Sequence, residues 1–223
     1  MSFQQKFYLH VEHGFTSFIS VTVLKSPESI SAVTTVHFSN NQRFTKFDLP
    51  YNVADWSIEL DKSTEKQCRL APDIILNVKG VGLGSLTRNA VIAEAKIQFA
   101  GHSLRPGKLT EKDGNIDNFK RRHHFYTNSG FKVIYNEDEL SGTIECNDLS
   151  LLNPSTTSLR KHNYVDTSIE DFFATKNSQI EQLNSKIRVL EATAAAKPEQ
   201  HWINAKNFLI FALAVVLVLS VFI

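Results

Sequence analysis

The chain has 223 residues, with 24 Lys plus Arg against 23 Asp plus Glu and a net charge of +1. This balance gives no electrostatic basis for binding a nucleic-acid backbone, and 42% hydrophobic residues with only 9 Gly and 6 Pro exclude disordered and collagen-like proteins. The two cysteines, Cys68 and Cys146, lie far apart and outside any CxxC or Cys/His cluster. Neither a disulfide scaffold nor a zinc site is indicated, and no metal is expected.

Strand-like alternation extends to about residue 78. Short β-branched and aromatic runs are separated there by Ser, Asn, Pro and Asp, and we predict strands at 6–11, 18–23, 33–38, 43–49, 56–60 and 74–78. The pattern then becomes helical at 85–99, with Leu86, Ala90, Ala93 or Glu94, and Ile97 on one side. A second helix is predicted at 116–127, followed by strands at 131–135 and 142–151. Strands first, then helices interleaved with strands, predict an α+β fold with a mixed sheet.

A glycine-rich turn lies where the strand-like pattern gives way to a helical one. Gly80, Gly82 and Gly84 join a predicted strand to a predicted helix. Glycines at a helix N-terminus leave main-chain N–H groups facing outward, which suits a phosphate or pyrophosphate. The turn is no P-loop, since no Gly-Lys-Ser/Thr follows, and the spacing is poor for a dinucleotide fingerprint. The alternative is a turn that serves tight packing only.

Two segments resemble the GNAT family of acyl-CoA-dependent N-acetyltransferases. Residues 79–84, Lys-Gly-Val-Gly-Leu-Gly, look like the family's Q/R-x-x-G-x-G/A pyrophosphate loop, with Lys79 where Gln or Arg is usual. Residues 121–131 are similar to its helix ending in Tyr-x-x-x-Gly-Phe. The resemblance covers about 74–151. It implies a mixed sheet splayed at its middle with flanking helices, and acetyl-CoA as co-substrate in the split.

The resemblance also implies roles for residues. The pantetheine arm would lie along Leu76, Asn77 and Val78, and Asn118 lies near a helix-start Asn that often contacts it, offset by one residue. The residues implied at the pyrophosphate are Lys79, Gly80, Val81, Gly82, Leu83, Gly84 and Ser85. Tyr126 stands where the family has the general acid that reprotonates the departing thiolate. The alternative for Tyr126 is an ordinary half-buried aromatic, and residues 120–124 suit either the nucleotide phosphate or a solvated helix face.

The first 70 residues depart from the family, which usually has two helices after its first strand. The acceptor site and the general base are therefore undefined; Asp73 is the nearest acid. Two functions remain open. One is an N-acyltransferase that moves an acetyl group to an unknown amine by direct attack. The other is a catalytically degenerate GNAT-fold scaffold protein.

A heptad pattern follows the body of the chain. Residues 166–195 lack Gly and Pro, and Lys176 occupies the one polar seam position. The apolar seam residues are Ile169, Phe173, Ile180, Leu183, Ile187, Leu190 and Ala194. This spacing predicts a coiled coil that forms a homodimer through 169–194, with Thr167 or Ser168 as the N-cap. The alternative is an amphipathic helix packed on its own domain.

The last 16 residues, 208–223, carry no charge, and 13 of them are Phe, Leu, Ile or Val. Such a run favours a transmembrane helix, and Trp202 and Lys206 suit the interface. No signal-peptide pattern opens the chain, so we expect a tail anchor in a lipid bilayer with the N-terminal domain in the cytoplasm. A buried helix is the alternative. The expected organisation is a domain at 1–155, a linker at 156–165, a stalk at 166–196, a hinge at 197–207 and the anchor at 208–223.

Overall fold

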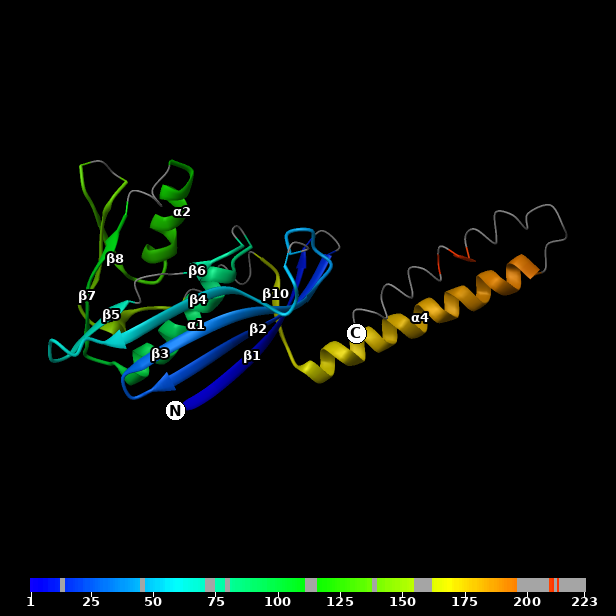
Figure 1. Ribbon diagram of the computed structural model, residues 1–223, viewed down its shortest axis with the longest axis horizontal. Coiled ribbons are helices and arrows are strands. Elements are labelled where there is room, and N and C mark those ends of the chain that lie inside the picture. The colour runs from blue at the N-terminus through cyan, green and yellow to red at the C-terminus, as the bar shows by residue number, and fades with distance from the viewer. Residues whose placement is uncertain are drawn as a thin grey trace. The chain divides into compact units, whose positions relative to one another are not determined.

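The computed structural model describes residues 1–12, 15–44, 47–70, 75–78, 81–110, 116–137, 140–154, 162–195, 209, 210 and 212. For residues 75, 76, 116–118 and 195 it describes the main chain alone. The chain forms two compact units, Met1–Thr167 and Ser168–Ile223. The first unit is α+β with a mixed sheet, as the order of patterns predicts (Figure 1).

Five antiparallel strands form one part of the sheet, in the order β10-β1-β2-β3-β4. Their bounds are Tyr164–Thr167, Ser2–Glu12, Phe15–Ser26, Ser29–Ser39 and Tyr51–Leu60. Along β3, buried residues alternate with partly buried ones, and Ile30, Ala32 and Thr34 lie on the buried face. One face of an antiparallel sheet commonly packs on the core in this way.

Helix α1, Leu83–Gln98, covers the buried face and contacts β3 and β4 (Figure 1). Thr87 is buried against the sheet, with its Oγ1 2.6 Å from Oγ1 of Thr34 on β3. Ala95, on the same side of the helix, is fully buried. Ile97, which we expected on the packed side, is 78% exposed. That expectation is wrong because two residues beyond Ala95 turn the helix through about 200°.

The remaining strands form the mixed part of the sheet. β5 (Gln67–Leu70) and β6 (Ile75–Leu76) both pair with β4, at different places along it. β7 (Ser103–Leu109) runs parallel to β5 and pairs with it only at Gln67↔Ser103 and Cys68↔Leu104. β9 (Gly142–Cys146) and β8 (Lys132–Tyr135) follow in antiparallel order. Within the described residues, the ladder between the two parts is therefore two residue pairs long.

Helix α2, Ile116–Thr127, has the predicted bounds and packs beside β8 (Figure 1). The chain leaves it through a turn in which the N–H groups of Ser129 and Phe131 donate to the carbonyl of Tyr126 at 3.0 and 3.3 Å. Gly130 has φ +90° in this turn, a conformation that glycine adopts without strain. The turn reverses the chain directly into β8.

Two predicted strands differ from the structure. The described residues of 43–49 form turns and bends, because Asn41 Oδ1 accepts from the N–H of Arg43 at 3.0 Å and the N–H of Phe44 donates to the carbonyl of Asn41 at 2.9 Å. The predicted strand 142–151 ends at Cys146, and Leu149–Leu151 form a short 3₁₀ helix, η2. Asp148 caps η2 by accepting from the N–H of Ser150 at 2.8 Å. The strands β5, β7 and β10 were not predicted.

The first unit extends beyond the expected boundary at 155. β10 is an edge strand, with Tyr164 opposite His10 and Thr167 opposite Phe7 of β1. Helix α4, Ile169–Ala195, follows at once in the second unit, as the heptad pattern predicts. Ser168 caps α4, since its Oγ accepts from the N–H of Asp171 at 2.9 Å. The last two residues of the expected linker 156–165 therefore belong to the sheet, as part of β10.

The expected transmembrane segment, 208–223, lies mostly outside the described residues, which include 209, 210 and 212 of it. Among the helices that are described, none is both long and apolar enough to cross a membrane.

Candidate functional site

The glycine turn enters α1 without a capping side chain. Gly82 is the N-cap residue, with φ +79°, and the N–H of Leu86 donates to its carbonyl at 3.1 Å. Gly82 offers no side chain to cap the N-terminal amides, and the first turn of α1 holds no acid. The positive end of the helix dipole is thus left without a compensating group from the helix itself. Of the predicted phosphate-binding residues, Lys79 and Gly80 lie outside the described residues.

Two side chains from the segment at β10 lie against this turn. The hydroxyl of Tyr164 donates to the carbonyl of Val81 at 2.6 Å. The ring of His162 touches Gly82 so closely that a Cβ there would lie 2.6 Å from His162 Cδ2. Tyr164 also stacks on His10, whose ring centroid is 4.8 Å away. Sequence reasoning missed both side chains, because the segment lies far along the chain from the turn.

Burial dominates the electrostatics of this contact. It raises the pKa of Tyr164, so the phenol stays protonated and can donate to Val81 at any physiological pH. Burial likewise lowers the pKa of His10, and the positive charges of His162 and Arg43 act in the same direction while Glu12 opposes them. A neutral His10 is therefore favoured beside the ring of Tyr164.

The strand before the turn has one edge that no described strand covers. β6 pairs with β4 at Asp55↔Ile75 and Ala54↔Leu76. One residue beyond it, the N–H of Asn77 donates to the carbonyl of Val53 at 2.8 Å. Main-chain groups alternate in direction along an extended strand, so those of Leu76 and Val78 face away from β4. Asn77 is instead held to β4, where its Nδ2 also donates to the carbonyl of Asn52 at 3.1 Å.

Tyr126 is buried, at 7% exposure, near the end of α2. Its ring meets those of Phe125 and Phe131 edge-on, with centroids 5.1 and 5.9 Å away. This environment also fits the alternative of a packed aromatic. The side chain of Asn118 lies outside what the structure describes.

The basic cluster at 120–124 divides between two roles. Lys120, Arg121 and His124 are exposed. Arg122 is buried at 8% exposure and donates from Nη1 to the carbonyl of Thr110 at 2.8 Å and from Nη2 to that of Leu140. It ties α2 to the end of β7 and to the turn before β9, which is a structural role.

Sequence reasoning also missed Arg88, a cation within the packed part of α1. Arg88 is 1% exposed and donates from Nη1 to the carbonyl of Phe125, the residue before Tyr126. Burial lowers its pKa to about 10, and the charge of Tyr126 opposes that shift. A single signal was present in the sequence: Thr87 and Arg88 interrupt the apolar pattern of the helix.

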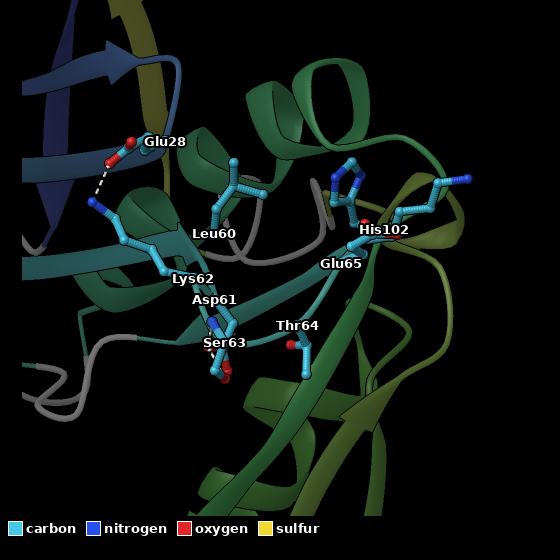
Figure 2. Close-up of a pocket in the computed structure, with 9 residues that line it drawn as sticks. Glu28, Leu60, Asp61, Lys62, Ser63, Thr64, Glu65 and His102 are labelled. Atoms are coloured by element: carbon cyan, nitrogen blue, oxygen red, sulfur yellow. Dashed lines mark hydrogen bonds and ion pairs between the residues drawn. The ribbon is translucent and has the colours of Figure 1, made fainter.

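Two hollows lie among the described residues, and neither is lined by the glycine turn or by Tyr126. One of about 360 Å³ is lined by Leu60, the turn 61–66, Glu28 and His102 (Figure 2). Figure 2 shows Lys62 reaching Glu28, an exposed pair with Nζ and Oε2 2.8 Å apart. A smaller hollow of about 190 Å³ lies between α1 and the strands β1 and β2. In the described chain, no group of three or more His, Cys, Asp or Glu is arranged to hold a metal ion.

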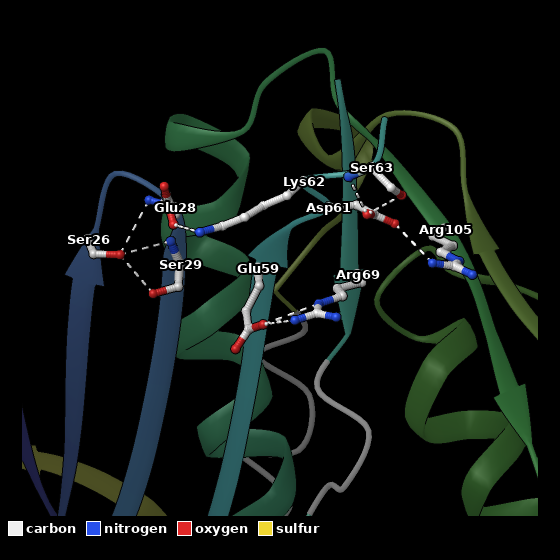
Figure 3. A network of polar contacts seen from close by, with 9 residues as sticks. All are labelled: Ser26, Glu28, Ser29, Glu59, Asp61, Lys62, Ser63, Arg69 and Arg105. Carbon is white, nitrogen blue, oxygen red and sulfur yellow. Dashed lines mark hydrogen bonds and ion pairs between the residues drawn. The ribbon is translucent and has the colours of Figure 1, made fainter. Parts of the chain in front are cut away.

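A polar network fixes the end of the sheet where β5 and β7 do pair (Figure 3). The carboxylate of Asp61 accepts from Ser63 Oγ at 2.6 Å, from the N–H of Ser63 at 3.0 Å and from Arg105 Nη1 of β7 at 3.2 Å. The N–H of Ser103 donates to the carbonyl of Lys66 at 3.0 Å. These bonds connect the turn between β4 and β5 to β7, at the end of the sheet where β5 and β7 are paired.

Asp61→Asn is expected to lower the melting temperature at pH 7. It is also expected to reduce the amount by which the melting temperature falls in acid. The hydrogen bonds from Ser63, followed by those from Arg105, lower the pKa of Asp61. A carboxylate with a lowered folded-state pKa stabilises the fold above its unfolded pKa of about 3.9, and this contribution is lost as pH falls through the folded value. As the pH is lowered from 7 to 2, the melting temperature of the wild type should therefore approach that of Asp61→Asn. A difference that stays constant with pH would contradict this. Glu59→Gln, which affects an exposed pair with Arg69, is the control and should change little.

No family model matches the chain, and no curated protein is similar enough to count as a match.

Proposed function

We propose that the protein is an acyl-CoA-dependent N-acyltransferase of the GNAT type, which transfers an acyl group, acetyl in the simplest case, to an amine. The observation that supports this most is the uncovered edge of β6, which leads through the glycine turn into the uncapped start of α1. A pantetheine arm carries amide groups and can add to such an edge as an extra strand does. The pyrophosphate then meets the helix N-terminus.

The sheet offers room for this arrangement. The parallel ladder of β5 and β7 ends after two residue pairs, and β6 pairs with β4 and with no other described strand. The two halves can therefore diverge beyond Cys68 and Leu104, as in a splayed sheet. Tyr126 comes from α2, beside the β8 half, and the arm would come from the β4 half. A ligand in the split would lie between the two.

The reaction follows from these roles. The amine nitrogen attacks the thioester carbonyl carbon, a C–N bond forms, and the C–S bond breaks with its electron pair on sulfur. Tyr126 gives its proton to the thiolate, and the proton lost by the amine returns to the phenolate through solvent. Bringing amine and thioester together supplies much of the rate, so the lack of an assigned base does not prevent catalysis.

Titration calorimetry of the full chain in mild detergent with acetyl-CoA tests the proposal. We expect saturable binding at micromolar to millimolar ligand. The absence of binding at millimolar acetyl-CoA would overturn it. The full chain is required, because a fragment ending at residue 155 lacks Tyr164 and the strand β10.

A second function, that of a membrane-anchored scaffold of the same fold without catalysis, is supported by α4. Its seam residues Phe173, Leu183 and Leu190 are 48%, 39% and 46% exposed. Apolar side chains at heptad spacing favour pairing with a second copy. The apolar run 208–223 would attach either protein to a membrane, and extraction at alkaline pH that released it from membranes would contradict that attachment.

The double substitution Leu183→Glu, Leu190→Glu is expected to convert a dimer of the full chain into a monomer, because each pair of helices would bury four carboxylates. Sedimentation equilibrium in density-matched detergent measures this. Val189→Glu is the matched control, since Val189 is apolar and 63% exposed but lies off the seam. A wild-type monomer at high concentration would contradict the coiled coil.

A further inference from the structure

Arg88 is a buried cation without an acidic partner among the described residues. Its Nη2 donates to Asn89 Oδ1 at 3.1 Å, and its Cζ lies 4.5 Å from the centroid of the Phe125 ring. Its Nε has no hydrogen-bond partner. None of the ion pairs among the described residues includes Arg88. A guanidinium at 1% exposure thus loses its hydration without gaining a counter-ion.

The charge of Arg88 persists at physiological pH. Burial lowers the pKa to about 10, which is still well above 7. Among the described residues, Tyr126 is the titratable group that acts on Arg88, and it carries a negative charge only after its phenol has lost the proton. The side chain that precedes Arg88, Thr87, meets neutral Thr34 of β3. A buried charge that the protein does not neutralise is costly in the empty state, and such costs are typical of groups that face a charged ligand.

The position of Arg88 suits one particular anion. It contacts Phe125, the chain neighbour of Tyr126, and lies six residues after Gly82 on α1, about 9 Å along the helix axis. An arm that begins at the pyrophosphate and ends in a sulfur can span that separation. Acyl transfer places negative charge first on the thioester oxygen and then on the sulfur.

We propose that Arg88 is a catalytic residue that stabilises the oxyanion and the coenzyme A thiolate beside Tyr126. The inference rests on the proposed function. When the C–S bond breaks, its electron pair stays on sulfur opposite the guanidinium until Tyr126 donates its proton. Arg88 keeps its own protons throughout, so it acts by charge alone.

The test compares coenzyme A with desulfo-coenzyme A, which lacks only the sulfur, by calorimetry on the full chain at pH 7 and pH 9. An adjacent cation lowers a thiol pKa from about 8.5 by about one to two units. The preference for coenzyme A over the desulfo compound should therefore rise about tenfold between pH 7 and pH 9. Both ligands carry the same phosphates, so titration of the phosphates changes both affinities equally and does not change their ratio.

Arg88→Met should bind both compounds with a ratio that does not change with pH, and Arg88→Lys should retain part of the rise. Arg122→Met is the control, because Arg122 is likewise buried but bonds the carbonyls of Thr110 and Leu140, whereas Arg88 bonds that of Phe125, next to Tyr126. Its ratio should rise as in the wild type. Melting curves report folding of each variant, and Arg88→Met is expected to melt at or above the wild-type temperature.

The outcomes separate the two proposals. If the wild type binds both compounds but its ratio does not rise with pH, the role of Arg88 is wrong and the proposed function stands. An undiminished rise in Arg88→Met, or in Arg88→Lys if the Met variant does not fold, also overturns it. Failure of the wild type to bind either compound at millimolar concentration overturns the proposed function and this inference with it.

Discussion

Gly82→Ala is expected to lower the free energy of unfolding by about 2–5 kcal/mol. Gly82 has φ +79°, and forcing an L residue into the left-handed region costs about 1–2 kcal/mol. The new Cβ would also lie 2.6 Å from His162 Cδ2, and such overpacking typically costs about 1–3 kcal/mol more. The melting temperature should fall by about 5–15 °C. The same variant should lose acetyl-CoA binding, because the amides at the start of α1 would be displaced.

The chain contains a matched control for each part of that cost. Gly101 has φ +75°, but a Cβ there would meet nothing within 4 Å, so Gly101→Ala should cost only the conformational strain. In a His162→Ala background the overlap at Gly82 disappears, and Gly82→Ala should then cost about as much as Gly101→Ala. A double-mutant cycle gives the coupling energy directly. Equal costs for Gly82→Ala in both backgrounds would refute the contact between His162 and the turn.

Tyr126→Phe is expected to slow acyl transfer about 10²- to 10⁴-fold, the usual contribution of a positioned general acid. Affinity for acetyl-CoA should stay within about twofold, because the ring contacts with Phe125 and Phe131 do not involve the hydroxyl. Release of free thiol from acetyl-CoA, with a primary amine that supports turnover, measures the rate. Calorimetry measures the affinity.

Tyr135→Phe provides the comparison for Tyr126→Phe. The hydroxyl of Tyr135, on β8, is buried without a hydrogen-bond partner, so its removal should leave both rate and affinity unchanged. If Tyr126→Phe reduced rate and affinity to the same extent, Tyr126 would be a binding or packing residue and the general acid would have to be sought elsewhere.

Local patterns predicted most of the secondary structure. Period-two runs gave β1, β2, β3 and β4, and the helical patterns gave α1, α2 and α4, with α2 at its observed bounds. The run 43–49 failed because the turn at Asn41 depends on side-chain bonds that alternation does not reflect. β5 and β10 are four residues each, too short for a periodic signal against their surroundings. β7 was missed as well, because Pro106 and Gly107 interrupt its run and both residues are unfavourable within strands.

Some features of the candidate site follow from local sequence patterns, and others appear only in the tertiary structure. The sequence alone determined the glycine turn, the helix after it and a tyrosine at the end of α2, since each depends on residue types at fixed local spacing. Only the tertiary structure placed Tyr164 on Val81, 83 residues apart, and His162 on Gly82. It alone showed the two-pair ladder of β5 and β7, and it alone showed that Arg88 is buried with no acid beside it in the part of the chain that is described. Contacts between distant segments follow from how the elements pack together, and no periodic pattern of residue types in the sequence indicates them.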